Sequence, residues 1–200
     1  FDGSNGRALT GHSHGLIRTF TSSPNLANQI TFERHADPAL SLFFPQSVFK
    51  VTPALLQTPE FYQFSEGFDF IYEMAAFQFY SCDRARQISH IKQFLKPGGL
   101  VFFLEKLNHP NPDEYLRREQ IKDEDFKTRY FSEEDICWKR QQMLEQMQNG
   151  QVTLEELVSA LSARFKIVRL IWSSSNFCEF VASDDPKQVA QFLDLIGRVV

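Results

Sequence analysis

The sequence has few cysteines, no long apolar run and no concentration of basic charge. Its three cysteines, Cys82, Cys137 and Cys178, are isolated and lack the spacing of metal ligands. Such thiols are typical of a reducing compartment rather than of a disulfide framework, so we expect a cytoplasmic protein. No apolar run is long enough to cross a bilayer and no signal peptide is visible, so no membrane partner is expected.

Charge and length narrow the class of protein further. The net charge is −4 and the basic residues are dispersed, which gives no electrostatic footprint for nucleic acid. A chain of 200 residues is predicted to form a single domain, residues 1–200. Because the chain opens at Phe1 and not at Met, we expect further residues to precede it in the full protein. The sequence does not indicate an oligomeric state.

The run Leu95–Gly99 is the most informative local signal that the chain does contain. Lys96 suits a helix C-terminus, Pro97 prevents another helical turn, and the two glycines that follow allow positive φ angles. The unbroken apolar run Leu100–Leu104 comes next. A strand without polar alternation is typical of a parallel sheet that helices cover on both faces.

Strand and helix patterns alternate through the first half of the chain. Strands are predicted at Arg7–Thr10, Ile30–Arg34, Val48–Val51, Phe68–Tyr72 and Leu100–Leu104, and helices at Leu16–Asn28, Ala39–Phe44, Leu55–Ser65 and Ser81–Leu95. This alternation predicts an α/β fold with a doubly wound, mostly parallel sheet.

The second half begins with a polar stretch, Asn108–Tyr130, which predicts a surface insertion or lid. Two capping boxes then start helices at Ser132 and Thr153. Two strands follow, Phe165–Ser173 and Phe177–Ser183, and their short connection demands antiparallel neighbours. A last helix is predicted from Asp185.

A small-residue loop, Gly11-His12-Ser13-His14-Gly15, is predicted to follow the first strand and to open a helix, where backbone N–H groups can face a polar ligand. Asp37 lies roughly twenty residues farther on, the separation at which an acid meets ribose hydroxyls in a nucleotide-binding βαβ unit. A plain turn is the alternative for the loop. His12 and His14 suggest metal ligands, but no third ligand is placed, so no metal is expected.

The order of elements, the Leu95–Gly99 turn before a buried strand and the reversed hairpin at the end together resemble class I S-adenosylmethionine-dependent methyltransferases. The resemblance runs from about Gly11 to Ser183. It implies a Rossmann-like, seven-stranded, mostly parallel sheet with a C-terminal antiparallel hairpin, and S-adenosyl-L-methionine as cofactor.

The resemblance also implies positions for the cofactor. Residues Gly11, Ser13 and Gly15 would line its methionine part, Asp37 its ribose, Thr52, Ala54 and Leu55 its adenine, and Glu73 and Met74 its sulfonium. A second register is open, in which Thr21–Pro24 ends a strand and Gly3 and Gly6 are the remnants of the loop. In that register Asp37 loses its role.

Methyl transfer from a sulfonium is an in-line displacement that chiefly requires positioning, although a base helps with a hydroxyl acceptor. The resemblance places Glu73, Tyr80 and His109, together with Glu105, on loops that face the cleft, with Glu73 the first choice as base. The segment 108–150 would recognise a small-molecule acceptor. The alternatives are a non-catalytic binding module of the same fold and a serine hydrolase, in which Ser13 of the G-x-S-x-G pattern attacks.

Overall fold

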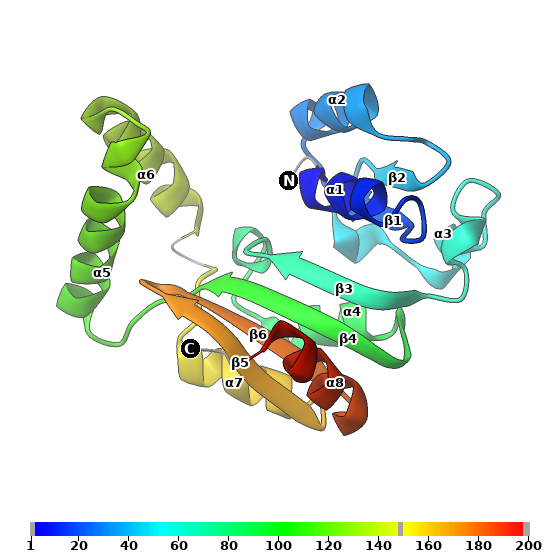
Figure 1. The fold of residues 1–200 in the computed structure, drawn as a ribbon. Coiled ribbons are helices and arrows are strands. Elements are labelled where there is room, and N and C mark those ends of the chain that lie inside the picture. Colours follow the sequence, from blue (N-terminus) through cyan, green and yellow to red (C-terminus); the bar gives the residue numbers. More distant parts are fainter. Residues whose placement is uncertain (1–2, 148–149, 198–200) are drawn as a thin grey trace. The chain divides into compact units, whose positions relative to one another are not determined.

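The computed structural model describes residues 3–147 and 150–197, and the chain divides into two compact units, Phe1–Gly67 and Phe68–Val200. We call them the N-terminal unit and the C-terminal unit and describe each by itself (Figure 1). Both combine helices with a β-sheet, so the predicted α/β class is confirmed.

The N-terminal unit contains a two-stranded parallel sheet in which Thr19 lies opposite Ser41. Its elements are α1 (Ser4–His12), β1 (Thr19–Ser22), α2 (Leu26–His35), β2 (Ser41–Phe44), α3 (Pro53–Leu56) and the short 3-10 turns η1 (Val48–Lys50) and η2 (Tyr62–Phe64). The ring of Phe20 lies between 5.4 and 6.2 Å from the rings of Phe44, Phe61 and Phe64. These phenylalanines form the core of the unit.

Most of the elements predicted before residue 67 are wrong. The structure has helix where strands were predicted at Arg7–Thr10 and Ile30–Arg34, strand within the helices predicted at Leu16–Asn28 and Ala39–Phe44, and a 3-10 turn in place of the strand at Val48–Val51. Caps explain part of the difference, because the Asn25 side chain accepts a hydrogen bond from Ala27 N at 2.8 Å and starts α2. The second register is the observed one for the strand, since β1 ends at Ser22.

The C-terminal unit is built on a four-stranded mixed sheet of order β3-β4-β6-β5. Its strands are β3 (Phe68–Met74), β4 (Leu95–Lys106), β5 (Ile167–Ser174) and β6 (Phe177–Ser183), and its helices are α4 (Arg84–Lys92), α5 (Pro112–Asp125), α6 (Glu133–Met147), α7 (Leu154–Ser162) and α8 (Pro186–Ile196), with 3-10 turns η3 (Phe77–Phe79) and η4 (Lys127–Arg129). Strands β3 and β4 are parallel, whereas β6 is antiparallel to both β4 and β5. The seven-stranded sheet is not confirmed, because the described residues form sheets of two and four strands.

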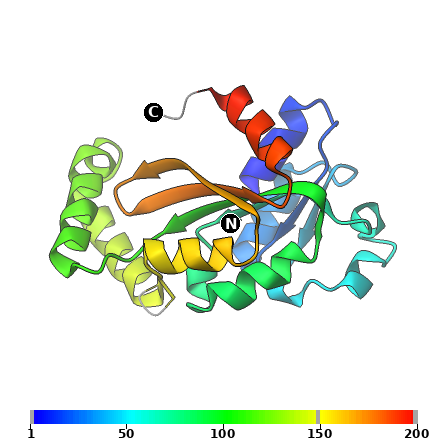
Figure 2. The ribbon, with the colours of Figure 1, turned by 90° about the horizontal axis from the view of Figure 1, so that it is seen from below.

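Helices cover the four-stranded sheet on both faces: α4 and α7 lie on one face and α8 lies on the other (Figure 2). Successive residues of β4 alternate between these layers. The ring of Phe103 packs toward Phe165 on the α7 side, at 6.5 Å, and that of Phe102 packs toward Phe192 of α8, at 5.0 Å. This alternation explains why β4 reads as a continuous apolar run.

The Leu95–Gly99 run forms the beginning of β4, where the pairing with β3 is interrupted by a bulge. Phe68 pairs with Leu95 but Phe70 pairs with Leu100, so five residue steps on β4 face two on β3. Positive φ was predicted for both glycines, and it is confirmed for Gly98, with a φ of 77°, but not for Gly99. A Cβ on Gly99 would lie 3.0 Å from the backbone oxygen of Asp69. The glycines therefore serve the bulge rather than a separate connecting turn.

The predicted acceptor segment 108–150 contains α5, which lies in the polar stretch Asn108–Tyr130, and α6, which follows it. It leaves and rejoins the sheet at neighbouring points, because Asn108 N donates to Val152 O at 2.8 Å and Asn108 forms a parallel bridge with Thr153. Lys106 is the last residue of β4, and its Nζ lies 2.8 Å from Oε2 of Glu119 in α5; both side chains are buried. The segment is thus tied to the end of the sheet by its own polar groups.

Candidate functional site

Three connections meet at one edge of the four-stranded sheet. The parallel strands β3 and β4 end at Met74 and Lys106, and β6 begins beside Lys106 at Phe177. The loop after β3 (75–83), the loop after β4 (107–111) and the link at 175–176 therefore share this edge. Ligands of α/β sheets collect at the carboxyl ends of the parallel strands, so this edge is the candidate site.

Glu73 is one of two buried acids at this edge, the other being Glu105. Glu73 Oε1 accepts hydrogen bonds from the backbone N–H groups of Ala76 and Phe77, the latter at 3.0 Å, while its Oε2 has no hydrogen-bond partner among the described residues. Burial, and next the neighbouring Glu105 carboxylate, raises the pKa of Glu73 well above its ordinary value, although the two amides act in the opposite direction. The carboxyl group therefore shapes the loop after β3 from a buried position in which its ionisation is disfavoured.

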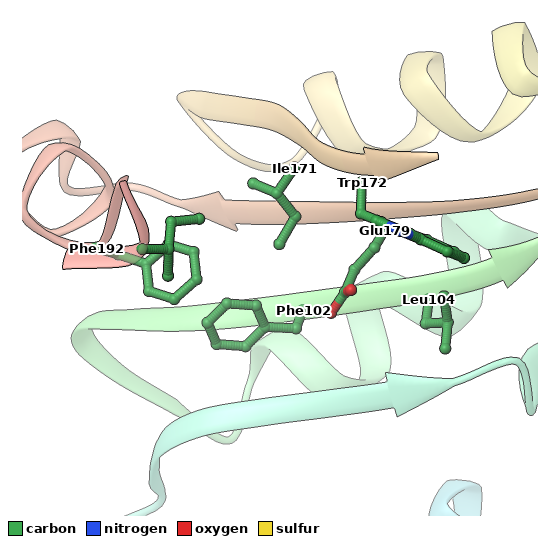
Figure 3. Close-up of a pocket in the computed structure, with 7 residues that line it drawn as sticks. Phe102, Leu104, Ile171, Trp172, Glu179 and Phe192 are labelled. Carbon is green, nitrogen blue, oxygen red and sulfur yellow. The ribbon is translucent and has the colours of Figure 1, made fainter. Parts of the chain in front are cut away.

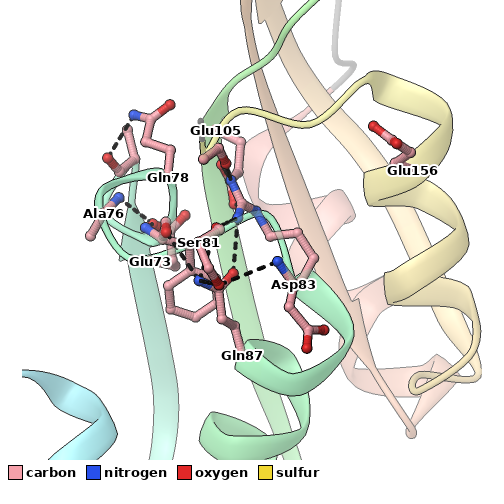
Figure 4. Close-up of polar contacts among 12 residues, drawn as sticks. Glu73, Ala76, Gln78, Ser81, Asp83, Gln87, Glu105 and Glu156 are labelled. Atoms are coloured by element: carbon pink, nitrogen blue, oxygen red, sulfur yellow. Dashed lines mark hydrogen bonds and ion pairs between the residues drawn. The ribbon is translucent and has the colours of Figure 1, made fainter. Parts of the chain in front are cut away.

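A charged network lies directly beside it (Figure 4). The Arg84 guanidinium binds the Glu105 carboxylate through two hydrogen bonds, Nε to Oε1 at 2.7 Å and Nη2 to Oε2 at 3.0 Å, and both side chains are almost fully buried. Gln87 donates to the backbone oxygens of Phe77 and Ser81 at 3.0 and 3.2 Å. The loop after β3 is thus held from α4 and β4 as well as by Glu73.

Backbone conformation in the same loop is unusual. Ala75 has a φ of 49°, a left-handed value that non-glycine residues rarely adopt. Gln78 donates from Nε2 to the Ala75 oxygen at 2.8 Å and so supports that conformation. Positive φ at a non-glycine residue tends to persist where surrounding contacts enforce it, as they do here.

Tyr80 and His109 lie at this edge with partly exposed side chains. Tyr80 is 41% exposed, on the turn that follows η3. His109 Nδ1 lies within hydrogen-bond distance of both Asn111 N, at 3.0 Å, and Asn111 O, at 3.1 Å, so the backbone of residue 111 orients the ring. The structure therefore brings the predicted residues Glu73, Met74, Tyr80 and His109 to one edge of one sheet.

The predicted cofactor loop has a different setting. Gly11 and His12 belong to the end of α1, and Ser13 is its C-cap, so the loop closes a helix instead of opening one. Its amides are already bonded, Ser13 N to Leu9 O at 3.0 Å and Gly15 N to Thr10 O at 3.0 Å. The premise of free N–H groups is wrong, and so is the premise of a nucleophile elbow, which needs a strand followed by a helix around Ser13.

Asp37 also lies away from the carboxyl ends of the strands. It follows α2 and precedes β2, and its Oδ1 accepts a hydrogen bond from Ala39 N at 2.9 Å. Thr52 is the N-cap of α3, with Ala54 and Leu55 inside that short helix. The strands that were expected to lead into Asp37 and Thr52 are absent, because those residues are helical or in a 3-10 turn.

Polar groups that were not among the expected cofactor contacts lie at the carboxyl ends of β1 and β2. Ser22 Oγ donates to Gln46 O at 2.7 Å, which links the residues after the two strands, and Asn28 Nδ2 donates to Ser23 Oγ at 2.9 Å. The run Thr21-Ser22-Ser23-Pro24 was the available signal for a strand end. In the C-terminal unit, the missed residues are Arg84 and Gln87, and the signal was an acid near the end of each of two apolar strands.

An open groove of about 480 Å³ lies on the α8 face of the four-stranded sheet (Figure 3). It is lined by Phe102, Leu104, Ile171, Trp172, Glu179, Phe192 and Ile196. Beside it, burial, and next the Glu179 carboxylate, raises the pKa of Tyr72 to about 12. Trp172 is 47% exposed and Phe70 on the same face is 58% exposed, so apolar surface remains uncovered there.

Two kinds of feature are not found in the part of the chain that the structure describes. Histidine, cysteine and acidic side chains do not gather in groups of three that could hold a metal ion. None of the described helices has the length and apolar character needed to span a bilayer.

Comparison with known proteins identifies the fold. No family model matches the sequence, and neither does any curated protein. Among solved structures, an O-methyltransferase family protein from Burkholderia thailandensis superposes with a TM-score of 0.58 at 13% identity, covering 91% of this chain and 48% of that one. Human N-acetylserotonin methyltransferase, solved with S-adenosylmethionine, gives 0.52 at 15% identity, covering 91% and 44%.

The mitomycin 7-O-methyltransferase MmcR gives a TM-score of 0.53 at 13% identity, covering 91% of this chain and 46% of that one. The chain spans about half the length of each of these structures. At these identities the likeness concerns the fold alone, which this chain shares with these methyltransferase structures.

Proposed function

We propose that the chain takes part in S-adenosylmethionine-dependent methyl transfer to a small-molecule acceptor, acting in the cytoplasm. The observation that carries the proposal is the sheet order β3-β4-β6-β5, with a parallel pair and a reversed strand inserted beside it, in a chain that superposes on O-methyltransferases. The proposed cofactor is S-adenosyl-L-methionine, which is present in one of the similar structures.

For the acceptor we propose the carboxyl edge of β3 and β4, with segment 108–150 on the acceptor side. Tyr80 and His109 are the proposed proton acceptors for a hydroxyl substrate, because their polar atoms lie on partly exposed side chains. Glu73 is proposed to position the loop beside Met74 rather than to take a proton, because its carboxyl is buried and bound to backbone amides.

For the cofactor contacts of the N-terminal unit we propose the residues that follow β1 and β2 rather than Gly11–Gly15, Asp37 and Thr52–Leu55. The hydroxyls of Ser22 and Ser23 lie at that end. Ser22 donates to Gln46 O, and its oxygen is able to accept from a ribose hydroxyl, whereas Ser23 is buried and supports the site by accepting from Asn28 Nδ2. These groups are neutral, so the fit to the cofactor depends on hydrogen bonds without the acidic partner that Asp37 was expected to supply. When bound, the cofactor would supply an electrophilic methyl group.

Calorimetry with S-adenosylhomocysteine tests this proposal. We expect the protein to bind, Ser22→Ala to weaken binding several-fold, as the loss of one hydrogen bond does, and Asp37→Ala to leave the affinity unchanged. Absence of binding in the unmodified protein would overturn the proposal. A loss of affinity confined to Asp37→Ala would instead place the cofactor contacts at the amino end of β2.

Two further measurements separate the alternatives. Transfer of a labelled methyl group to any member of a panel of phenols distinguishes an enzyme from a non-catalytic module, which would bind S-adenosylhomocysteine without transfer. A fluorophosphonate tests the serine hydrolase, and we expect Ser13 to stay unlabelled, because its hydroxyl donates to Thr10 O at 3.1 Å on a helix C-terminus.

A further inference from the structure

Two segments that are far apart in the sequence meet in backbone contact in the C-terminal unit. Gly150, in the connection between α6 and α7, lies against Gln78 in the loop after β3. A Cβ on Gly150 would be 1.8 Å from the Gln78 oxygen and 2.6 Å from its carbonyl carbon. No side chain fits in that space, so this approach requires glycine at position 150.

Arg84 binds both of these segments. Besides its two bonds to Glu105, its Nη2 donates to the Gly150 oxygen at 2.9 Å and its Nη1 donates to the Ser81 oxygen at 2.6 Å. The remaining bond runs from Nη1 to Gln87 Oε1 at 2.9 Å. All five N–H donors of the guanidinium are therefore used, on four different parts of the unit.

The chemistry of this network favours a role in geometry over a role in overall stability. A buried ion pair contributes little net stability compared with apolar packing of the same volume, because two charges must leave water. A planar guanidinium with fixed donors does set directions, which a lysine ammonium cannot reproduce. Arg84 and Glu105 are 2% and 0% exposed, so water does not substitute for a lost donor.

The position of Gly150 determines which segment the Arg84 network holds in place. Segment 108–150 leaves the sheet at Asn108 and returns through Gly150 to Val152, which bonds to Asn108. The Arg84 bond to Gly150 thus fixes the returning end of α5 and α6 against the loop that carries Tyr80. The same guanidinium fixes the Ser81 end of that loop.

We propose that Arg84 is a positioning residue that joins the acceptor-side segment 108–150 to the loop after β3, so that both present a fixed surface to the methyl acceptor. The naming of an acceptor rests on the function proposed above, whereas the coupling of the two segments does not. Gly150 is required as well, because the lack of a side chain there allows the two segments to come into backbone contact.

Amide hydrogen exchange on the unmodified chain and on Arg84→Lys tests the coupling directly. Lysine keeps a positive charge beside Glu105 but cannot supply the bonds to Ser81 and Gly150 together. We expect amides of residues 76–81, together with Asn108, to exchange about tenfold faster or more, while those of Phe180–Ala182 in β6 stay unchanged. Arg86→Lys, on the exposed face of α4, is the matched control and should change neither set.

Uniform acceleration over the whole unit in Arg84→Lys would overturn the proposal, since it would mean general destabilisation. Faster exchange in residues 76–81 without Asn108, or at Asn108 without residues 76–81, would overturn it as well. Gly150→Ala provides an independent check, because it keeps Arg84 but prevents the close approach of residue 150 to Gln78. We expect the amides of residues 76–81 and of Asn108 to exchange faster in this variant too.

If methyl transfer is observed, we expect Arg84→Lys to raise KM for the acceptor about tenfold, while the affinity for S-adenosylhomocysteine is unchanged. An unchanged KM beside altered exchange would overturn the acceptor role. If S-adenosylhomocysteine does not bind, the proposed function fails, yet the exchange experiment still decides whether Arg84 couples the segments.

Discussion

At the scale of single residues, Glu73 gives the C-terminal unit a distinct dependence on pH. Its pKa is raised above the ordinary value of 4.5 by burial and by Glu105, so above pH 4.5 the folded protein holds a proton that the unfolded chain releases. The stability that this proton contributes is complete below pH 4.5 and is lost as pH rises toward the raised pKa.

Glu73→Gln should remove this dependence, because the amide stays neutral and its oxygen still accepts from Ala76 and Phe77. We expect the free energy of unfolding of the variant to rise relative to that of the unmodified protein as pH increases above 4.5. Chemical denaturation at several pH values measures the difference. Glu124→Gln, at an exposed site, gives the effect of removing one surface charge, and parallel curves for Glu73→Gln would contradict the assignment.

Tyr72 and Glu179 form a second residue-scale pair, on the α8 face. The pKa of Tyr72 is raised to about 12, by burial first and then by Glu179. We expect Glu179→Gln to lower the pKa of Tyr72, because the neighbouring negative charge that opposes ionisation is gone. Ultraviolet titration measures it, with Tyr72→Phe used to identify this phenol among the five tyrosines. An unchanged titration would show that the two groups do not interact.

At the scale of elements, α7 shows how a local signal can determine a helix. Thr153 and Glu156 form the predicted capping box, in which Thr153 Oγ1 accepts from Glu156 N and Glu156 accepts from Thr153 N at 2.7 Å. Thr153→Ala should lower the free energy of unfolding by about 1 kcal/mol, and Thr153→Ser should restore most of it. Urea denaturation checks both variants, and equal losses in the two would argue against the cap.

Prediction of elements succeeded where strands are long and failed where they are short. β3, β4, α4, α7 and α8 were predicted from apolar runs or caps that tertiary packing then reinforces. In the N-terminal unit, β1 and β2 have only four residues each, which is too short for a clear pattern. The alternation at Ile30–Arg34 therefore predicts a strand, although the cap at Asn25 starts a helix there.

The location of each site residue was predicted correctly only where the strand before it was predicted correctly. Glu73 and Tyr80 could be placed at a strand end because β3 was predicted correctly. Asp37 and Ser13 were misplaced together with their strands. The Arg84 network was beyond reach, because it joins residues up to 66 positions apart and no local pattern records such a contact.

At the scale of the whole molecule, each of the two units has its own core, and this can be tested with fluorescence. Trp138 and Trp172, the only tryptophans, both belong to the C-terminal unit, so their emission reports that unit alone. Phe61→Ala removes a ring that is 3% exposed in the N-terminal unit and should cost that unit about 3–5 kcal/mol.

We expect Phe61→Ala to separate the two unfolding transitions, with circular dichroism changing at a lower denaturant concentration than tryptophan emission. Phe103→Ala, in the core of the C-terminal unit, is the reciprocal variant and should shift the emission first. Coincident transitions in both variants would show a single cooperative unit.

The hydrogen bond between Asn108 and Val152 has a consequence for how such a chain can diverge. A segment whose two ends are already joined adds little loop-closure entropy when it grows, about 0.6 kcal/mol for each doubling of its length. The strands on either side need not move when residues are gained or lost between these positions. Recombination can therefore exchange the helices of segment 108–150 while the sheet that supports them stays intact.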